Sequence, residues 1–465
     1  MIHRLRAVYE TLPQGARLIL GSAARSLPVA LRYGRAYVEE RRLIMMTERD
    51  HSATRALVNQ RLSQVMIASM RSSLSRDRVP RSMRARENWS VDDLCEIPPI
   101  DKDALRGRSD EMRDPLVPPR YMRYVTTGGT SGAQVGFWLD KDTSLRDWAY
   151  VIAAWERVGF VLDDSRVVLR GVRLGQGSER VLTQYEPIRR EMYVSTFDMD
   201  ANNMPTIMDR IDAFGAEYIH GYPSALETLG RAYRIAGRQP PQTRALLAVS
   251  ENLLPAQREA LAQMFDARVF SLYGMSERTC FAAECEQGSA LHVADTYGVV
   301  ELISTDGRVI TEPGIRGEIV ATGLISYGMP LIRYRTGDYA AWAEGECACG
   351  RVGRRLQQIE GRREREFLVS RNQHRIYMTA INMHSPGLDS VARYRFVQER
   401  AGEAVLLLEP GFGYTAAIGE TILNEIRAKL EGQVNITLDV TDHIPLSPRG
   451  KHVFIDQRMP ADELP

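Results

Sequence analysis

The sequence lacks any long, uninterrupted run of apolar residues. The longest apolar stretch near the N-terminus, residues 18–31, contains Arg25 and is interrupted by Pro28. It is therefore too short to cross a bilayer as one helix, and it has neither the apolar core nor the cleavage site of a secretory signal. We expect a cytoplasmic protein with no membrane-spanning segment.

An excess of charge of either sign is also missing. The 60 basic and 59 acidic residues leave a net charge of +1, and the chain is 44% hydrophobic and 26% charged. These values are typical of globular proteins, whereas a nucleic-acid-binding protein carries a strongly basic surface. We expect no nucleic-acid partner, and 465 residues suffice for about three domains.

Cysteine is scarce, with five residues in the whole chain. So few cysteines exclude a disulfide framework. Cys285 with His292, and Cys347 with Cys349, form two groups that together offer three thiols and one imidazole, a ligand set that suits Zn²⁺. Cys280 is a rival ligand, and the alternative is that the cysteines are reduced and pack in the core.

The pattern along the chain predicts an α/β protein with three parts. Residues 1–85 mix apolar and basic positions at helical spacing, which indicates peripheral helices. Residues 86–360 contain alternating strand and helix segments, typical of parallel α/β layers, followed by short strands with glycine turns that indicate a β-rich subdomain. Residues 361–465 predict a compact α+β domain.

A segment rich in glycine and hydroxyl groups lies between two short predicted strands. Glycines let backbone N–H groups approach an oxyanion, and hydroxyls add short donors, so the segment suits phosphate. It differs from the loop of P-loop NTPases, because no lysine follows the glycines and no helix opens behind them. The alternative is a plain glycine-rich hairpin. Its residues are Thr126, Thr127, Gly128, Gly129, Thr130, Ser131 and Gly132.

Polar or aromatic residues follow three predicted strands, at the edge where α/β sheets bind ligands. Tyr273 offers a ring to an adenine, Asp338 a hydrogen-bonding acid to a ribose, and Glu277 a carboxylate to Mg²⁺. Asp338 also follows Gly337, so the alternative is a turn residue. The other residues at these strand ends are His220, Gly221, Tyr222, Pro223, Ser250, Glu251, Gly274 and Ser276.

Taken together and in their order along the chain, these motifs resemble those of the adenylate-forming ligases, in particular the phenylacetate-CoA ligase and CapK-like branch. The resemblance covers nearly the whole chain. Residues 126–132 resemble the phosphate loop of that family, residues 273–277 its aromatic-Gly-x-Ser/Thr-Glu motif, and residues 334–338 its ribose-binding motif. Gly361 and Arg362 resemble the start of the interdomain hinge, and residues 445–451 resemble the catalytic-lysine motif.

The resemblance implies a large N-terminal α/β adenylating domain and a small mobile α+β domain at the C-terminus. It also implies a two-step reaction. A carboxylate attacks the α-phosphorus of ATP to give an acyl-adenylate and pyrophosphate, and an acceptor then displaces AMP. Lys451 would bridge the two anions as a compact ammonium, and a hinge near Glu364 would swing it away. Ser250, Glu251 and Arg362 would contact the nucleotide.

The acid is expected to lie among residues 172–178, 220–224 and 250–252, with an aryl or arylacetic acid as the first candidate. His220 either bonds to its carboxylate or is satisfied within the core. CoA is the expected acceptor. The alternatives are an amine, transfer of AMP itself as in relatives that adenylate a deazaflavin cofactor, and a binding protein without turnover. The oligomeric state is open, with a homodimer as one option.

Similar Cys and His motifs occur in the phenylacetate-CoA ligase-like branch, so the resemblance favours a structural zinc. The chain departs from the wider family in the phosphate loop, where Ala133, Gln134 and Val135 replace the usual lysine. The phosphate charge would then be met by Mg²⁺, backbone amides and Arg335 or Arg362. The hinge is also unusual, since residues 363–366 read Arg-Glu-Arg-Glu.

Overall fold

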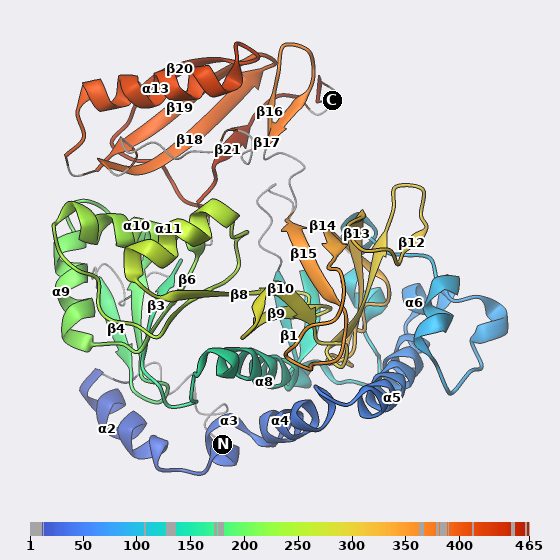
Figure 1. Cartoon of the computed structure of the whole chain (residues 1–465). Coiled ribbons are helices and arrows are strands. Elements are labelled where there is room, and N and C mark those ends of the chain that lie inside the picture. Colours follow the sequence, from blue (N-terminus) through green and yellow to red (C-terminus); the bar gives the residue numbers. More distant parts are fainter. Residues whose placement is uncertain are drawn as a thin grey trace. The chain divides into compact units, whose positions relative to one another are not determined.

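The structure is a computed structural model that divides into two compact units. Unit 1 consists of Met1–Asp164, Glu186–Arg189 and Phe270–Gly361, and unit 2 consists of Ser165–Tyr185, Arg190–Val269 and Arg362–Pro465. Many of the helices and strands of both units are labelled in Figure 1. The structure describes residues 12, 14–106, 108–126, 136–171, 174, 181–361, 367–377, 381, 388, 390–411, 413–447, 452–460 and 463–464.

Unit 1 begins with the helices that the sequence predicts. Asp50 caps the longest of them, α5, by accepting hydrogen bonds from the backbone N–H groups of Ser52 (2.8 Å) and Ala53 (3.0 Å). Such a cap satisfies donors that the first turn leaves unpaired. The helices are α2 (Gln14–Arg25), α3 (Val29–Tyr33), α4 (Arg35–Thr47), α5 (His51–Ser69) and α6 (Ser73–Arg78).

The predicted hairpin is present, with β1 (Met122–Thr126) antiparallel to β2 (Gly136–Asp140). The residues that join the two strands lie outside the described part of the chain. Two short helices precede the hairpin: η2 (Val91–Glu96), which is a 3-10 helix, and α7 (Lys102–Leu105). After the hairpin, α8 (Thr143–Trp155) buries Ile152 and Trp155.

The larger sheet of unit 1 is antiparallel. Its strands lie in the order β12 (Val309–Ile310), β11 (Gly298–Ile303), β13 (Arg316–Gly323), β14 (Tyr334–Trp342), β15 (Arg355–Glu360), β10 (Gly288–Val293), β9 (Phe281–Cys285) and β8 (Arg268–Gly274). Gly298 pairs with Gly323 across two of these strands. A Cβ atom at Gly298 would lie 1.9 Å from the backbone oxygen of Thr279. The glycine therefore allows the turn after β8 to lie directly on the sheet.

Unit 2 contains the parallel strands that the alternating pattern predicts. Strand β3 (Arg166–Arg170) pairs in parallel with β5 (Glu191–Ser195) and β6 (Tyr218–Gly221), and β6 pairs with β7 (Ala245–Ala248). All four residues of β7 are buried, as expected for a parallel strand with both faces covered. The other elements are β4 (Thr183–Glu186), α9 (Met204–Phe214), α10 (Pro223–Ile235) and α11 (Pro255–Phe265).

The C-terminal part of unit 2 mixes strands and a helix. Its four-stranded sheet has the order β20 (Asn435–Val440), β19 (Glu403–Pro410), β18 (Val391–Arg400) and β21 (Ile455–Gln457). Helix α13 (Ala416–Leu430) packs its buried Ile422, Leu423 and Ile426 into the same core as Leu406. A hairpin of β16 (Phe367–Val369) and β17 (Arg375–Tyr377) completes this part. Thus the predicted α/β class is confirmed.

None of the helices in the described part of the chain combines the length and the apolar composition needed to cross a membrane.

Candidate nucleotide and metal sites

The second-to-last residue of strand β8 is aromatic, and an acid fixes its hydroxyl. The hydroxyl of Tyr273 donates a hydrogen bond to Oδ2 of Asp338 at 2.6 Å. Burial, together with the charge of Asp338, raises the pKa of Tyr273 well above its usual value, so this hydroxyl is a permanent donor. The structure therefore brings together the ring and the acid that the sequence assigned to an adenine and a ribose.

The backbone around Asp338 holds its carboxylate in place on β14. Gly337 has φ +75, a left-handed conformation that favours glycine. The backbone N–H of Asp338 donates to Oγ1 of Thr336 (3.0 Å), and that hydroxyl donates to the backbone oxygen of Ile319 (2.7 Å). Asp338 is thus a strand residue beside an irregularity in the pairing of β14, and its side chain is held in the candidate site.

Glu277 lies in the turn after β8 and is only 6% exposed. One carboxylate oxygen, Oε1, accepts a hydrogen bond from the Tyr334 hydroxyl at 2.9 Å. The same oxygen lies 3.8 Å from Nζ of Lys102. A buried carboxylate requires such partners because losing its hydration costs several kcal/mol. Lys102 was not assigned to the site from the sequence, although it directly follows Asp101, a residue type that commonly caps helices.

Contacts with helix α8 stabilise the conformation of the turn after β8. Arg278 follows Glu277 and has φ +57, which is strained for a residue with a side chain. Its guanidinium donates to Oδ1 of Asp147 on α8 at 2.7 Å. The hydroxyl of Tyr297 donates to the same oxygen at 2.9 Å. These bonds anchor the turn, and Ser276 lies half-buried within it.

Unit 2 holds the other predicted strand-end residues. Glu251 follows β7, and its carboxylate accepts hydrogen bonds from the backbone N–H and the hydroxyl of Ser224, both at 3.1 Å. It therefore caps the N-terminus of α10, where a negative charge is stabilising. Ser250 precedes it with φ +67. The roles of Ser250 and Glu251 toward a nucleotide stay predictions.

The segment after β6 is more deeply packed than the sequence indicated. Tyr222 is 8% exposed and belongs to the apolar core of unit 2, next to Pro223 at the start of α10. A Cβ atom at Gly221 would lie 2.8 Å from that of Leu169, so glycine is needed there for strand packing. Burial and the positive charge of Arg166 lower the pKa of His220 to about 3. The imidazole is therefore neutral at pH 7.

Several predicted residues fall outside the described part of the chain. They are Thr127, Gly128, Gly129, Thr130, Ser131 and Gly132 of the glycine-rich loop, residues 172–173 and 175–178 of the segment expected near the acid, Arg362 and Glu364 of the hinge, and Lys451. Thr126 is the last residue of β1.

Unit 1 also gathers the four predicted zinc ligands. The ligand atoms of Cys285, His292, Cys347 and Cys349 all lie within 4.8 Å of one another. The sulfurs of Cys285 and Cys347 are 3.6 Å apart, and Sγ of Cys349 is 3.4 Å from Nε2 of His292. A tetrahedral Zn²⁺ with ordinary bond lengths would place such pairs about 3.5–3.8 Å apart. The rival ligand, Cys280, lies outside this group.

The chemistry of the four residues also fits a metal. Burial, with the charges of Arg157, Arg355 and Arg351, lowers the pKa of His292 to about 4, so its ring is neutral and can offer a lone pair. Backbone N–H groups point at two sulfurs: Gln287 donates to Cys285 at 3.4 Å, and Arg351 donates to Cys349 at 3.5 Å. Such bonds stabilise thiolates and orient them toward an ion.

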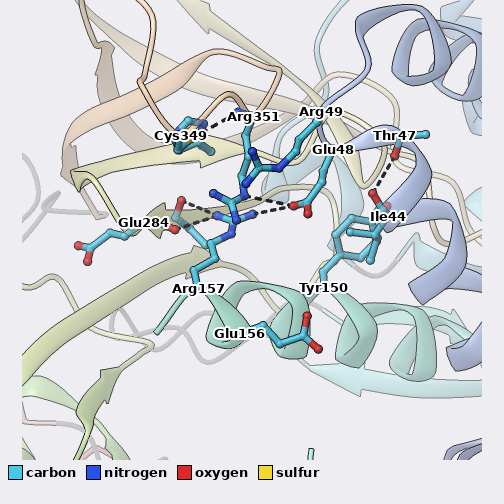
Figure 2. A network of polar contacts seen from close by, with 12 residues as sticks. Ile44, Thr47, Glu48, Arg49, Tyr150, Glu156, Arg157, Glu284, Cys349 and Arg351 are labelled. Atoms are coloured by element: carbon cyan, nitrogen blue, oxygen red, sulfur yellow. Dashed lines mark hydrogen bonds and ion pairs between the residues drawn. The ribbon is translucent and has the colours of Figure 1, made fainter. Parts of the chain in front are cut away.

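A network of arginines and acids surrounds this cluster, and Figure 2 shows its centre. Glu48 lies between two guanidinium groups, 3.2 Å from Nε of Arg351 and 3.9 Å from Nη2 of Arg157. Arg351 also pairs with Glu286 at 2.6 Å. The backbone oxygen of Glu48 accepts from Val352 at 2.9 Å. The C-terminal end of α4 is thereby tied to the loop that carries Cys349.

Comparisons with known proteins agree with this architecture. The chain is 28% identical over 256 residues to a phenylacetate-coenzyme A ligase of Thermus thermophilus, a match that covers 50% of this chain and 57% of that protein. It is 22% identical over 376 residues to protein CapK of Staphylococcus aureus, covering 78% and 80%. The first match thus spans only part of the length of its relative. No protein-family model matches the chain.

Solved structures share the fold. A 2-hydroxyisobutyryl-CoA ligase in its postadenylation state superposes with a TM-score of 0.65 at 19% identity, covering 89% of this chain and 91% of that one. The same enzyme in its thioesterification state gives a TM-score of 0.54 at 20% identity, covering 88% and 91%. The two sequence relatives and the shared fold confirm the resemblance seen in the motifs, and they support the adenylate-forming, acyl-CoA synthetase-like superfamily.

Proposed function

We propose that the protein is an AMP-forming acid ligase that activates a carboxylic acid as an acyl-adenylate and then transfers it to CoA. One observation carries this proposal: the bonded pair of Tyr273 and Asp338 stands beside the turn that buries Glu277. The names of the relatives support it, since a phenylacetate-CoA ligase and a 2-hydroxyisobutyryl-CoA ligase both activate acids for CoA.

Each residue then has a distinct task. Tyr273 offers its ring to the adenine, Asp338 accepts hydrogen bonds from the ribose, and residues 126–132 donate backbone N–H groups to the phosphates. The carboxylate of Glu277 would hold Mg²⁺, an oxygen-binding cation that neutralises phosphate charge. Lys451 brings an ammonium between the two reacting anions.

We assign the carboxylic acid to the residues at the end of β6. His220 contributes a neutral imidazole, which could donate a hydrogen bond to the carboxylate of the acid without carrying charge. We place residues 221–223 near the acid and keep an aryl or arylacetic acid as the first candidate.

A panel assay tests the reaction and its acceptor. We expect pyrophosphate release that depends on ATP, Mg²⁺ and one class of acid, with CoA consumed in equal amount. Pyrophosphate release without CoA consumption would favour an amine acceptor or the transfer of AMP itself. If no acid in a broad panel releases pyrophosphate while the folded protein binds no ATP, the proposal is wrong.

We further propose that Cys285, His292, Cys347 and Cys349 hold a structural Zn²⁺. Elemental analysis of purified protein is expected to find about one zinc per chain, as a closed four-ligand site requires. The substitution Cys349→Ser should abolish the zinc and lower the melting temperature. Cys280→Ser is the matched control, since Cys280 is also buried but lies outside the group. Fully active protein without zinc would refute the site.

A further inference from the structure

The glycine-rich loop contains no cation to meet the charge of a triphosphate. Residues 133–135, where many relatives place a lysine, are Ala, Gln and Val. Lysine is rare throughout the chain, since only Lys102, Lys141, Lys429 and Lys451 occur among the 60 basic residues. A lysine ammonium is a compact charge with three donors, and it binds phosphate differently from the planar fork of arginine. We therefore asked which of the four lysines lies near the candidate nucleotide site.

The backbone holds Lys102 beside the strand that carries Asp338. The N–H of Ile100 donates to the backbone oxygen of Arg333 at 2.9 Å, and the N–H of Arg335 donates back to Ile100 at 2.8 Å. Asp101 then caps α7 by accepting from the N–H of Ala104 at 2.9 Å. Lys102 is the first residue of that helix. The backbone position of Lys102 is therefore fixed by the bonds of Ile100 before it and by the capped helix after it.

The ammonium of Lys102 lies at the candidate nucleotide site. Its Nζ is 3.8 Å from Oε1 of Glu277, and the side chains of the two residues are 17% and 5% exposed. At 3.8 Å the contact is an ion pair and too long for a direct hydrogen bond. Within the described residues the ammonium has no hydrogen-bond acceptor, so its three N–H donors are available to a ligand.

The neighbouring guanidinium groups are already engaged. Arg335, which the sequence offered as a phosphate ligand, donates from Nε to Oε2 of Glu318 at 2.9 Å. Arg278 donates to Asp147 at 2.7 Å. Each of these arginines would have to break a hydrogen bond to an acid to reach a phosphate, whereas the described residues give Lys102 only the longer ion pair with Glu277.

We propose that Lys102 supplies to the triphosphate of ATP the positive charge that the glycine-rich loop lacks. Its ammonium donates hydrogen bonds to phosphate oxygens while Glu277, its ion-pair partner, holds the Mg²⁺ of the same nucleotide. This role rests on the proposed function. The competing explanation is that Lys102 only compensates the buried charge of Glu277, which would make it important for stability and irrelevant to phosphate.

Binding of MgATP and of adenosine to the full chain, measured by calorimetry, separates the two explanations. The variant Lys102→Met should weaken MgATP binding about tenfold, the scale for losing a charged hydrogen bond, and should leave adenosine binding unchanged because adenosine has no phosphate. Lys141→Met, an exposed lysine elsewhere in unit 1, is the control and should bind both ligands like the wild type.

Lys102→Arg covers the case in which Lys102→Met does not fold, because it keeps a positive charge beside Glu277. It should melt within a few degrees of the wild type and still bind MgATP more weakly, since the fork of arginine places its donors differently. Equal losses for MgATP and adenosine, or no loss for either variant, would overturn the role of Lys102. A wild-type protein that binds no MgATP would instead refute the proposed function.

Discussion

Replacing Lys451 with alanine is expected to slow acyl-adenylate formation by about two to three powers of ten, the scale for removing one charge-stabilising group from a site without water. The acid and the α-phosphate are both anions, and the ammonium between them offsets their repulsion as the new bond forms. Exchange of labelled pyrophosphate into ATP, measured with a saturating acid, reports this step directly.

The second half-reaction is the internal comparison for Lys451→Ala. Thioester formation from supplied acyl-adenylate should fall much less, because the lysine is expected to have moved away by then. Lys429→Ala is the matched control, since Lys429 lies on α13 in the same part of the chain. Equal losses in both half-reactions would show that Lys451 does not move out of the site between them, and the proposed rotation of the C-terminal domain would be wrong.

Replacing Glu277 with glutamine should lower the use of MgATP by about a hundredfold, the upper range for hydrogen bonds to charged groups. Glutamine keeps the shape of the side chain and an oxygen that can accept from the Tyr334 hydroxyl, but it removes the charge that a Mg²⁺ ion needs. The apparent affinity for Mg²⁺, measured at fixed ATP, is the quantity to compare.

A matched acid distinguishes a metal ligand from a buried ion pair. Glu301 lies on β11, is also largely buried, and pairs with Arg333 at 2.9 Å. The variant Glu301→Gln should lower the melting temperature and leave the Mg²⁺ dependence of the reaction unaltered. If Glu277→Gln also left that dependence unaltered, Glu277 would have no place in the nucleotide site.

The local elements of the fold were predictable because their signals are local. The alternation of strand and helix segments within residues 86–360 indicated parallel strands, which are present as β3, β5, β6 and β7, and the two short strands predicted around the glycine-rich segment are β1 and β2. The order of the motifs was sufficient to identify the superfamily, since each motif is read within a few residues.

The site was less predictable, because its contacts join distant segments. Glu251 was expected to bind a nucleotide, and the structure shows that its carboxylate caps α10 through Ser224. Tyr222 was expected to line an acid pocket, and it lies in the apolar core of unit 2. The roles of both residues toward a ligand stay predictions, and no local pattern in the sequence indicated these capping and core contacts.

The sequence alone determined which residue types stand at the strand ends and in what order, because hydrophobic period, caps and glycines act over a few residues. The tertiary structure decided which of them meet. The sulfurs of Cys285 and Cys347, 62 positions apart, come within 3.6 Å, and one oxygen of Glu277 meets both Tyr334 and Lys102. Such meetings depend on strand register and on the packing of helices against the sheet, and these are properties of the whole folded chain.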